Sequence, residues 1–432
     1  MPEGNKNRNA FTSILMKDVY VGIDIKYYFQ NGLLKYDIIA KAHSDLSLFK
    51  MRIEGDDLFS VVDEKTIQLN NFNSPIEDKI SYSYQTINSE LRNVNVRFQV
   101  KDGVIGFIAD SLDSNYELVI DPSLLFSSYI GGSNDDYEYT GGISKDNAGN
   151  IVVTGRTLSV NFPTTAGSYQ TSSAGNIDCV VFKLNATGNT LLFATYIGGA
   201  SLDAGYTTLV NPITNEIYVG GTTASNFFPT VNGAFQTTYG GGAYDGFVVK
   251  LNNSGSLLIS STLVGNSQQD LIASICFDNN YDIVFVGQTT GTFISTGTGF
   301  QNFYGGGPWD VFIGKINQSL SSLLFTTMLG GSGDDHCHAV KVDATGNICI
   351  MGFTSGSMPV SSGSYDQTYN GGIWDTYCAK MNASLSQNIF CTYIGSSGDD
   401  WAWNSIEIDN LGNIYVAGYT NGNDLPTTIG CV

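Results

Sequence analysis

The chain repeats itself with a period near 66 residues, and this repetition constrains its fold more than any other feature. Five similar segments begin at Phe126, Phe193, Ile259, Phe325 and Phe390, and successive starts lie 67, 66, 66 and 65 residues apart. The first of them reads FSSYIGGSNDD and the fourth FTTMLGGSGDD. A period of this length is typical of architectures in which each copy forms one supersecondary unit.

Each period contains four short runs rich in Val, Ile, Phe and Tyr, bounded by Gly, Asn, Asp or Pro, which predict four β-strands. In the fourth copy the runs are Ala339–Val342, Ile348–Gly352, Thr376–Met381 and Ile389–Ile394. The turn Asp343–Asn347 between the first two has the composition of a hairpin with a bulge and a left-handed glycine.

Four antiparallel strands in each of several copies predict an all-β fold, a β-propeller of four-stranded blades. A parallel β-solenoid has far shorter coils without hairpins, and calcium-binding nonapeptide repeats recur every nine residues, so both fit less well. We expect about five blades, the last closed when Glu117–Ile120 and Leu124–Ile130 join the C-terminal hairpin at Ser405–Gly418. The alternative is a truncated chain that lacks further blades.

The first part of the chain lacks the repeat, and we predict a smaller β-rich domain over residues 1–115 followed by the propeller over residues 116–432. Strand-like alternation runs through Val19–Phe29, Leu33–Lys41, Val94–Val100 and Val104–Asp110. The segments Gln30–Gly32 and Lys101–Gly103 read as hairpin turns.

Composition excludes several functions. The 20 basic and 40 acidic residues give a net charge of −20, which disfavours binding to nucleic acid or anionic membranes. No stretch of eighteen apolar residues predicts a membrane span. Met1–Thr12 does not resemble a signal peptide, which by itself points to the cytoplasm. The seven cysteines form no CxxC pair, and Cys349 reads as a buried strand residue.

The motifs resemble those of the bacterial SBBP-repeat β-propeller proteins. They are TYIGG at Thr195–Gly199, the turn and strand at Asp409–Thr420, FPTT at Phe162–Thr165 and the strand Asp245–Asn252. Asp18–Phe29 and Leu118–Gly132 resemble the domain that often precedes such repeats. The resemblance implies a secreted or cell-surface protein, and because no signal peptide or C-terminal sorting module is recognised, we expect an incomplete chain.

Loops that join the second strand to the third, and each blade to the next, emerge on one face and are long, as binding loops often are. This face collects carboxylates that are calcium candidates, Asp135, Asp136, Asp334, Asp335, Asp399 and Asp400, together with Asp203 and Asp270. Turn capping by the same carboxylates is the favoured reading. No other cofactor is expected.

Aromatic residues recur beside the Gly-Gly pairs of these loops, and we regard them as ligand-binding candidates because aromatic rings stack on sugars. They are Tyr239, Tyr304, Trp309, Tyr369 and Trp374. Wedging between blades is the alternative role.

The lysines Lys183, Lys250, Lys315 and Lys380 recur once per blade, which indicates a structural contact rather than catalysis. His336 and His338 flank Cys337, but a zinc site there needs Asp or Cys partners. The chain lacks GxSxG, HExxH, Walker A and dinucleotide-binding motifs.

The sequence therefore predicts a non-enzymatic, secreted or cell-surface binding or adhesion scaffold. We expect a monomeric propeller that presents its long-loop face to a protein or polysaccharide. The alternatives are an extracellular carbohydrate-active hydrolase or lyase and a self-associating surface structural protein.

Overall fold

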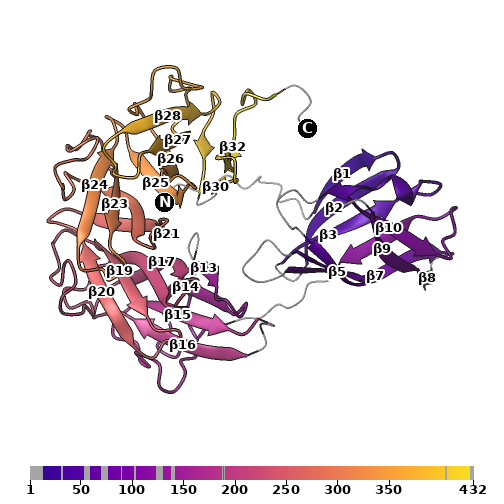
Figure 1. The fold of residues 1–432 in the computed structure, drawn as a ribbon, viewed down its shortest axis with the longest axis horizontal. Helices are drawn as coiled ribbons and strands as arrows, with labels where there is room; N and C mark the ends of the chain where they lie inside the picture. The colour runs from indigo at the N-terminus through magenta and orange to yellow at the C-terminus, as the bar shows by residue number, and fades with distance from the viewer. Residues whose placement is uncertain are drawn as a thin grey trace. The chain divides into compact units, whose positions relative to one another are not determined.

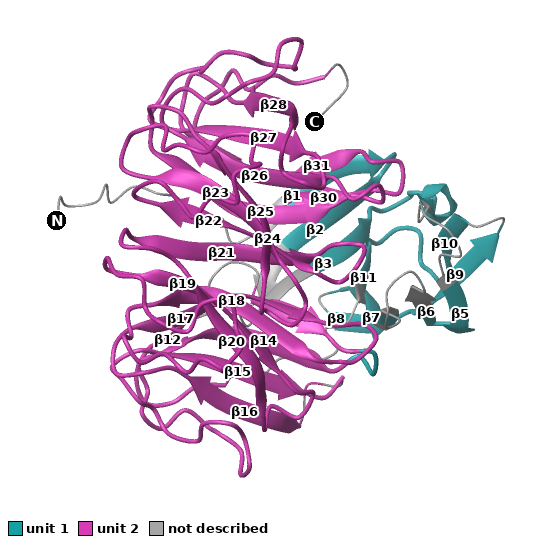
Figure 2. Cartoon of the chain, turned by 60° about the vertical axis from the view of Figure 1, so that its left-hand side comes forward, with its two compact units in different colours: residues 1–128, 147–149 teal, residues 129–146, 150–432 magenta. Residues whose placement is uncertain are grey.

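The computed structural model describes residues 13–30, 33–52, 59–69, 76–88, 90–101, 104–122, 130–137, 142–186, 188, 190–403 and 406–428. The chain divides into two compact units, residues 1–128 with 147–149 and residues 129–146 with 150–432 (Figure 2). Apart from one 3-10 turn, η1 (Leu46–Leu48), the regular elements of the described residues are β-strands. No helix among these residues is long and apolar enough to cross a membrane.

Unit 1 contains two antiparallel sheets that enclose an apolar core. The larger has the order β1 (Ser13–Tyr20), β2 (Ile23–Gln30), β3 (Leu33–Ala40), β11 (Leu118–Pro122), β7 (Ile76–Ile87), β6 (Thr66–Leu69) and β5 (Phe59–Asp63), with β8 (Glu90–Asn93) on β7. The smaller has the order β4 (Met51–Arg52), β10 (Val104–Asp110) and β9 (Asn95–Lys101). Ile23, Ile38, Val96, Leu118 and Ile120 lie in the shared core.

The pairings in unit 1 refine the strand predictions. Gln30 pairs with Leu33 and Lys101 with Val104, which confirms both hairpins. The predicted continuous strand Val19–Phe29 is wrong, because it is broken by a tight turn in which Gly22 has a φ of 78°. A left-handed φ is accessible to glycine at little cost, so the chain reverses there.

The predicted closure of a blade by Glu117–Ile120 is also wrong. In β11, Val119 pairs with Ile39 of β3 and with Tyr84 of β7, so this strand is central in the sheet of unit 1. An apolar strand buried on both sides finds its partners there, and it is not free to complete a propeller blade. Of the second predicted closing segment, Leu124–Ile130, all but Ile130 lies outside the described residues.

Unit 2 consists of successive antiparallel sheets. The first contains β12 (Asp136–Tyr137), β13 (Ile143–Lys145), β14 (Ile151–Thr157), β15 (Asp178–Leu184) and β16 (Leu191–Ile197), with β12 and β13 both on β14. The second is β17 (Asp203–Val210), β18 (Ile217–Thr223), β19 (Asp245–Leu251) and β20 (Leu258–Val264). The third is β21 (Asp270–Phe277), β22 (Ile283–Thr289), β23 (Asp310–Ile316) and β24 (Leu323–Leu329).

The fourth sheet is β25 (Asp335–Val342), β26 (Ile348–Thr354), β27 (Asp375–Met381) and β28 (Asn388–Ile394), which confirms the four strands predicted for this copy. Gly346 in the first hairpin has a φ of 87°, as the bulged turn requires. Two short pairings follow, β29 (Asp400–Trp401) with β32 (Tyr419–Thr420), and β30 (Ile406–Ile408) with β31 (Ile414–Val416). The described part of unit 2 thus holds four complete blades and one further hairpin.

The blades are arranged as in a β-propeller. The first strands β17, β21 and β25 contact one another on the inner side, and the fourth strands lie outward (Figure 1). Apolar side chains of adjacent blades share cores, as where Val248 of β19 packs with Ile272 and Ile275 of β21. Burial of these faces holds the blades together.

Ion pairs within each blade explain the recurring lysines. Each lysine of the third strand binds an acid of the first hairpin in its own blade, in the pairs Lys183–Asp146, Lys250–Glu216, Lys315–Asp278 and Lys380–Asp343, at 2.5, 2.7, 2.5 and 2.7 Å. In the second blade the turn residue is Asn211, and Glu216 supplies the charge instead. The repeated lysines therefore have a structural role.

Candidate functional site

The long loops of unit 2 emerge at one end of every blade, because strands alternate in direction. On this loop face lie the connections between second and third strands, residues 158–177, 224–244, 290–309 and 355–374, and the shorter connections between blades. The tight hairpin turns, such as Asp343–Asn347, lie at the opposite end. The eight acids and five aromatic residues that the sequence analysis assigned to the loop face all lie in or beside its connections.

The second acid of each Asp-Asp pair caps a turn. Asp335 Oδ2 accepts the Gly331 N–H at 2.8 Å, and Oδ1 accepts the hydroxyl of Thr354. Asp136 and Asp400 accept the N–H of the residue four positions earlier in the same way, at 2.8 and 2.6 Å. These oxygens are therefore occupied by N–H and O–H donors, as turn capping requires.

The first acid of each pair has a different neighbour in each blade. Asp135 accepts the hydroxyl of Tyr137 at 3.0 Å, and Asp399 accepts the Ile373 N–H at 2.6 Å. Asp334 lies 3.1 Å from Nε2 of His336. Among the described residues no group of three or more His, Cys, Asp or Glu side chains is arranged to hold a metal ion. Calcium binding by these acids stays a prediction.

Three of the predicted aromatic residues stabilise their own loops. The hydroxyls of Tyr239, Tyr304 and Tyr369 donate to the carbonyls of Gly242, Gly307 and Gly372, at 3.3, 2.7 and 3.3 Å. Trp309 and Trp374 each precede a third strand, and their carbonyls accept the N–H of Asp335 and Asp400, the first residues of the next blade. These contacts link one blade to the next.

One group of aromatic side chains departs from this structural pattern. We call this group the β25 cluster. It consists of His336 and His338 of β25, Phe353 of β26, Trp374 before β27 and Trp403 after β29. The ring centroids of His336 and Phe353 are 4.9 Å apart, and those of His338 and Trp403 are 4.4 Å apart. Phe353 also meets Trp374 edge-on at 5.0 Å.

Backbone register brings the β25 cluster together. His336 pairs directly with Phe353, so their side chains lie on the same face of the sheet. The register shifts between Cys337 and Ala339, and this irregularity changes the direction of the His338 side chain. The innermost strand of the blade therefore carries two imidazoles toward the loop face.

Burial keeps the imidazoles of the β25 cluster neutral. Desolvation lowers the pKa of His336 below its usual value, although Asp334 opposes the change. Desolvation and the neighbouring His336 lower the pKa of His338 to about 3. His338 Nε2 is buried and has no hydrogen-bond partner among the described residues. The cluster thus combines aromatic faces with an unsatisfied polar atom, while Trp403 is 51% exposed.

The β25 cluster has no counterpart in the second and third blades. The positions of His336 and His338 are occupied there by Ala204 and Tyr206, and by Leu271 and Ala273. A structural device is copied into every blade, whereas a binding site is normally singular. This makes the cluster the candidate functional site.

Comparison with known proteins agrees with the blade architecture. The model of a β-propeller repeat named SBBP matches residues 389–426, and the model of a domain of unknown function, DUF7948, matches residues 2–123. The chain carries an SBBP β-propeller repeat. Its N-terminal part is a DUF7948 domain, and this confirms the resemblance seen in the sequence motifs.

Solved structures similar to the SBBP-repeat protein are distant. A mannose phosphorylase from Leishmania mexicana in complex with phosphate is 12% identical, with a TM-score of 0.33, over 69% of this chain and 86% of the other. BamB from Moraxella catarrhalis is 10% identical, with a TM-score of 0.24, over 86% and 96%. No curated protein matches the chain.

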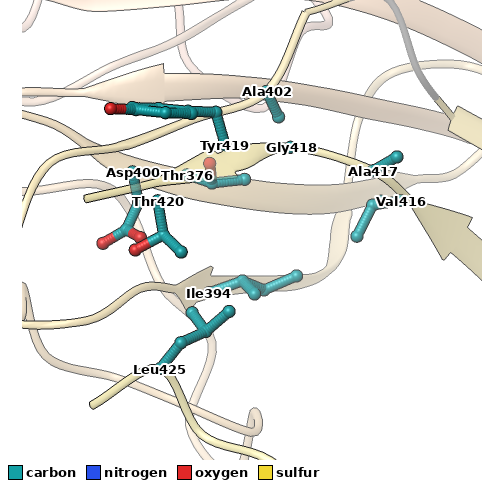
Figure 3. A pocket seen from close by; sticks show the side chains of 10 residues that line it. All are labelled: Thr376, Ile394, Asp400, Ala402, Val416, Ala417, Gly418, Tyr419, Thr420 and Leu425. Carbon is teal, nitrogen blue, oxygen red and sulfur yellow. The ribbon is translucent and has the colours of Figure 1, made fainter. Parts of the chain in front are cut away.

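A pocket of about 140 Å³ in the SBBP-repeat protein lies between the fourth blade and the last hairpin (Figure 3). Its walls are mostly apolar and include Ile394, Ala402, Val416 and Leu425. Asp400 at its edge is held by Ser396, whose N–H and hydroxyl it accepts at 2.6 and 2.9 Å. Because its lining consists of blade-packing residues, this pocket resembles a junction between sheets more than a ligand site.

Sequence reasoning considered His336 and His338 beside Asp334 as a zinc candidate and named Trp374 separately, and it did not join the histidines with the tryptophan. Phe353 and Trp403 were missed. The available signal was departure from the repeat: Phe353 stands where the second and third blades have Thr222 and Gln288. When one blade differs from the other blades at several positions near the same end of its sheet, the difference indicates a specific site.

Proposed function

We propose that this SBBP-repeat protein is a non-enzymatic binding scaffold located outside the cytoplasm, and that its β25 cluster binds a glycan. The observation that carries the proposal is the singular aromatic and imidazole group on the loop face of a repeated framework. Function placed on loops above a rigid scaffold is common in such folds.

The chemistry of the β25 cluster suits a sugar ring. An aromatic face is electron-rich, so it attracts the C–H groups on the apolar face of a pyranose. Trp403, half exposed, offers such a face. His338 Nε2 and the Asp334 carboxylate, which lies beside His336, are polar groups for hydroxyls of the ligand. Few convergent polar groups within an aromatic lining are typical of ligand sites.

The charge of the protein and of the site indicates whether a neutral or an acidic glycan binds. The net charge of −20 repels polyanions at a distance. In addition, the two imidazoles of the site are neutral, so they supply no positive charge to attract acidic sugars. We infer a neutral glycan, with a protein ligand as the alternative occupant of the same face.

Location outside the cytoplasm is supported by the family, since SBBP repeats are often found in extracellular proteins. The low share of charged residues, 14%, fits an exterior protein of this kind. Secretion or surface display would bring the loop face into contact with polysaccharides.

The test is retention of the full chain on a panel of immobilised neutral and acidic polysaccharides, followed by calorimetry with the best oligosaccharide. We expect retention on a neutral glycan and a loss of affinity of at least about tenfold, or 1.4 kcal/mol, in Trp403→Ala. Phe227→Ala is the matched control, because Phe227 is 93% exposed on another loop of the same face. Retention that survives Trp403→Ala, or self-association without any ligand, contradicts the proposal.

A carbohydrate-active enzyme is the second candidate, favoured by the His336–Asp334 contact at 3.1 Å in a single blade. Most glycosidases need two carboxylates flanking the scissile bond. In the β25 cluster Asp334 contacts an imidazole, whereas the adjacent Asp335 is buried and held by the Gly331 N–H and the Thr354 hydroxyl. Chromatography of the incubated glycan separates the two candidates. Shortened products that disappear in His336→Ala would establish the enzyme, and retention without products supports the scaffold.

A further inference from the structure

Each complete blade meets its neighbour through two buried acids. One is the first residue of a third strand and the other is the first residue of the next first strand. We call these the junction acid pairs: Asp178 with Asp203, Asp245 with Asp270, Asp310 with Asp335, and Asp375 with Asp400. A glycine lies against both acids in the first and third pairs, Gly198 and Gly330, and against the third-strand acid in the other two, Gly265 and Gly395. All eight acids are at most 3% exposed.

The glycines show how closely the carboxyls approach. A Cβ atom on Gly198 would lie 2.2 Å from Oδ1 of Asp178 and 2.8 Å from Oδ2 of Asp203. A Cβ atom on Gly330 would lie 3.0 Å from Oδ1 of Asp310 and 2.9 Å from Oδ2 of Asp335. In these two pairs both carboxyls therefore lie against one glycine, and no larger residue fits between them.

The two members of a pair differ in their donors. Asp203 is well supplied, since it accepts the Gly199 N–H at 2.7 Å, the Ser225 hydroxyl at 2.9 Å and the hydroxyl of Thr223. The third-strand acids accept on Oδ2 only, as Asp245 does from the Gly240 N–H at 2.6 Å. Among the described residues, Oδ1 of Asp178, Asp245, Asp310 and Asp375 is buried without any hydrogen-bond partner, and of the first-strand acids Asp270 shares this feature.

A buried carboxylate oxygen without a donor is costly, and a like charge beside it adds to the cost. A proton on Oδ1 removes both costs, because the oxygen becomes a donor and the neighbouring carboxylate is the acceptor. Among the described residues no ion pair joins these acids to Lys or Arg, which would offer another solution.

We propose that the third-strand acids Asp245, Asp310 and Asp375 bind a proton on Oδ1 as the pH falls through neutral, and that each then donates a hydrogen bond to the first-strand acid of the next blade. Three of the contacts between blades are thus carboxylic acid–carboxylate bonds. Because each bond needs a proton, mildly acidic conditions strengthen the contacts between blades.

The expected ionisation agrees with this geometry. Burial raises the pKa of Asp245 and of Asp310 to about 7, and the charge of the partner acid acts in the same direction. Burial likewise raises the pKa of Asp375 to about 6. The other titratable groups that face the pairs are tyrosines, thiols and acids: Tyr196 and Cys179, Tyr239 and Tyr244, Tyr304, Asp334, Tyr377 and Cys391, and Tyr369, Tyr393, Asp366 and Asp399.

The sign of the pH effect follows from proton binding. Between the ordinary aspartate pKa of 3.8 and about 7, the native state holds protons that the unfolded chain has released. The free energy of unfolding therefore falls as the pH rises through this window. Above the window the stabilisation by these protons is lost.

The test is the melting temperature of the full chain between pH 5 and pH 8.5 in EDTA, with Asp245→Asn and Asp270→Asn as variants. Asparagine at 245 places an N–H donor where the proposal puts O–H, so we expect a melting temperature at least about 2 °C above the wild type at pH 8 and a shallower decline with pH. Asparagine at 270 replaces the acceptor of the Asn266 N–H and is expected to destabilise at every pH.

Infrared spectroscopy gives a second readout that does not depend on the variants folding well. The wild type at pH 7 is expected to show the carbonyl band of protonated carboxylic acids, and Asp245→Asn to weaken it. Three results would overturn the proposal: no such band, a melting temperature that rises with pH, or a Ca²⁺-dependent gain at pH 8 that Asp245→Asn abolishes. The last would show that a cation occupies the pair.

Discussion

Nζ of Lys315 lies 2.5 Å from Oδ2 of Asp278, and the two side chains are only 10% and 6% exposed. Lys315 comes from the third strand of the third blade, and Asp278 begins its first hairpin turn. The pair ties the inner hairpin to the strand behind it, and each complete blade has an equivalent pair.

We expect Lys315→Met to lower the free energy of unfolding by about 3 to 5 kcal/mol, because it leaves the Asp278 charge buried and alone. Urea unfolding followed by circular dichroism measures the change. The double variant Lys315→Met with Asp278→Asn should recover most of the loss, since it removes both charges and keeps an oxygen for the Asn280 and Asp282 N–H groups. Equal losses in the single and double variants would contradict this account.

A second prediction concerns Gly352 in β26. A Cβ atom there would lie 1.8 Å from the carbonyl oxygen of His336 and 2.8 Å from the hydroxyl of Tyr377. Gly352→Ala must displace the backbone of β25, so we expect a loss of stability of about 2 to 3 kcal/mol together with weaker glycan binding.

The matched control for this variant is Gly363→Ala. Gly363 has a φ of 81° and nothing within 4 Å of an added Cβ atom, so only its backbone conformation is penalised. We expect a cost of about 1 to 2 kcal/mol and unchanged glycan affinity. If Gly352→Ala lowers the melting temperature more than Gly363→Ala does, but both variants bind the glycan equally well, then β25 does not position the site.

A third prediction concerns calcium. The oxygens of Asp335 are already occupied by the Gly331 N–H and the Thr354 hydroxyl, and Asp136 and Asp400 are held in a similar way. We therefore expect EDTA to leave the melting temperature unchanged. Because a ligand of the native state raises stability, a fall with EDTA that added Ca²⁺ reverses would show instead that these acids hold the ion.

The period of the sequence was enough to predict the four-stranded blades, because strand alternation and turn chemistry are local and occur in each copy. The burial of Cys349 followed from the same comparison of copies. The sheet that Glu117–Ile120 joins could not be predicted in this way, since an apolar strand can pair within any sheet. Its pairing with Ile39 and Tyr84 depends on residues far away in the chain.

The candidate site was predictable only in pieces for the same reason. HisCysHis was visible as an unusual segment, and Trp374 as a recurring aromatic position. Their meeting depends on the register of His336 with Phe353 and on the irregularity beside Cys337. The same irregularity recurs in the second and third blades, so what distinguishes the site is the set of residues that the fourth blade places at these positions. The junction acid pairs could not be recognised from the sequence for another reason. Turn capping explained one acid of each pair, and the other acid, such as Asp245, was interpreted as the start of a strand.

The last prediction concerns the pH dependence of glycan binding. The pKa of His338 is lowered to about 3 by burial and by His336, so its imidazole is neutral throughout pH 5 to pH 8. We expect calorimetry to give an affinity that varies less than about twofold over this range. His338→Gln, which keeps an uncharged polar group, should retain more affinity than His338→Ala. An affinity that rises tenfold between pH 8 and pH 5 would mean that a protonated imidazole contacts the ligand. The ligand would then be acidic, since a positive charge within the site attracts anions more strongly than the net charge of the chain repels them at a distance.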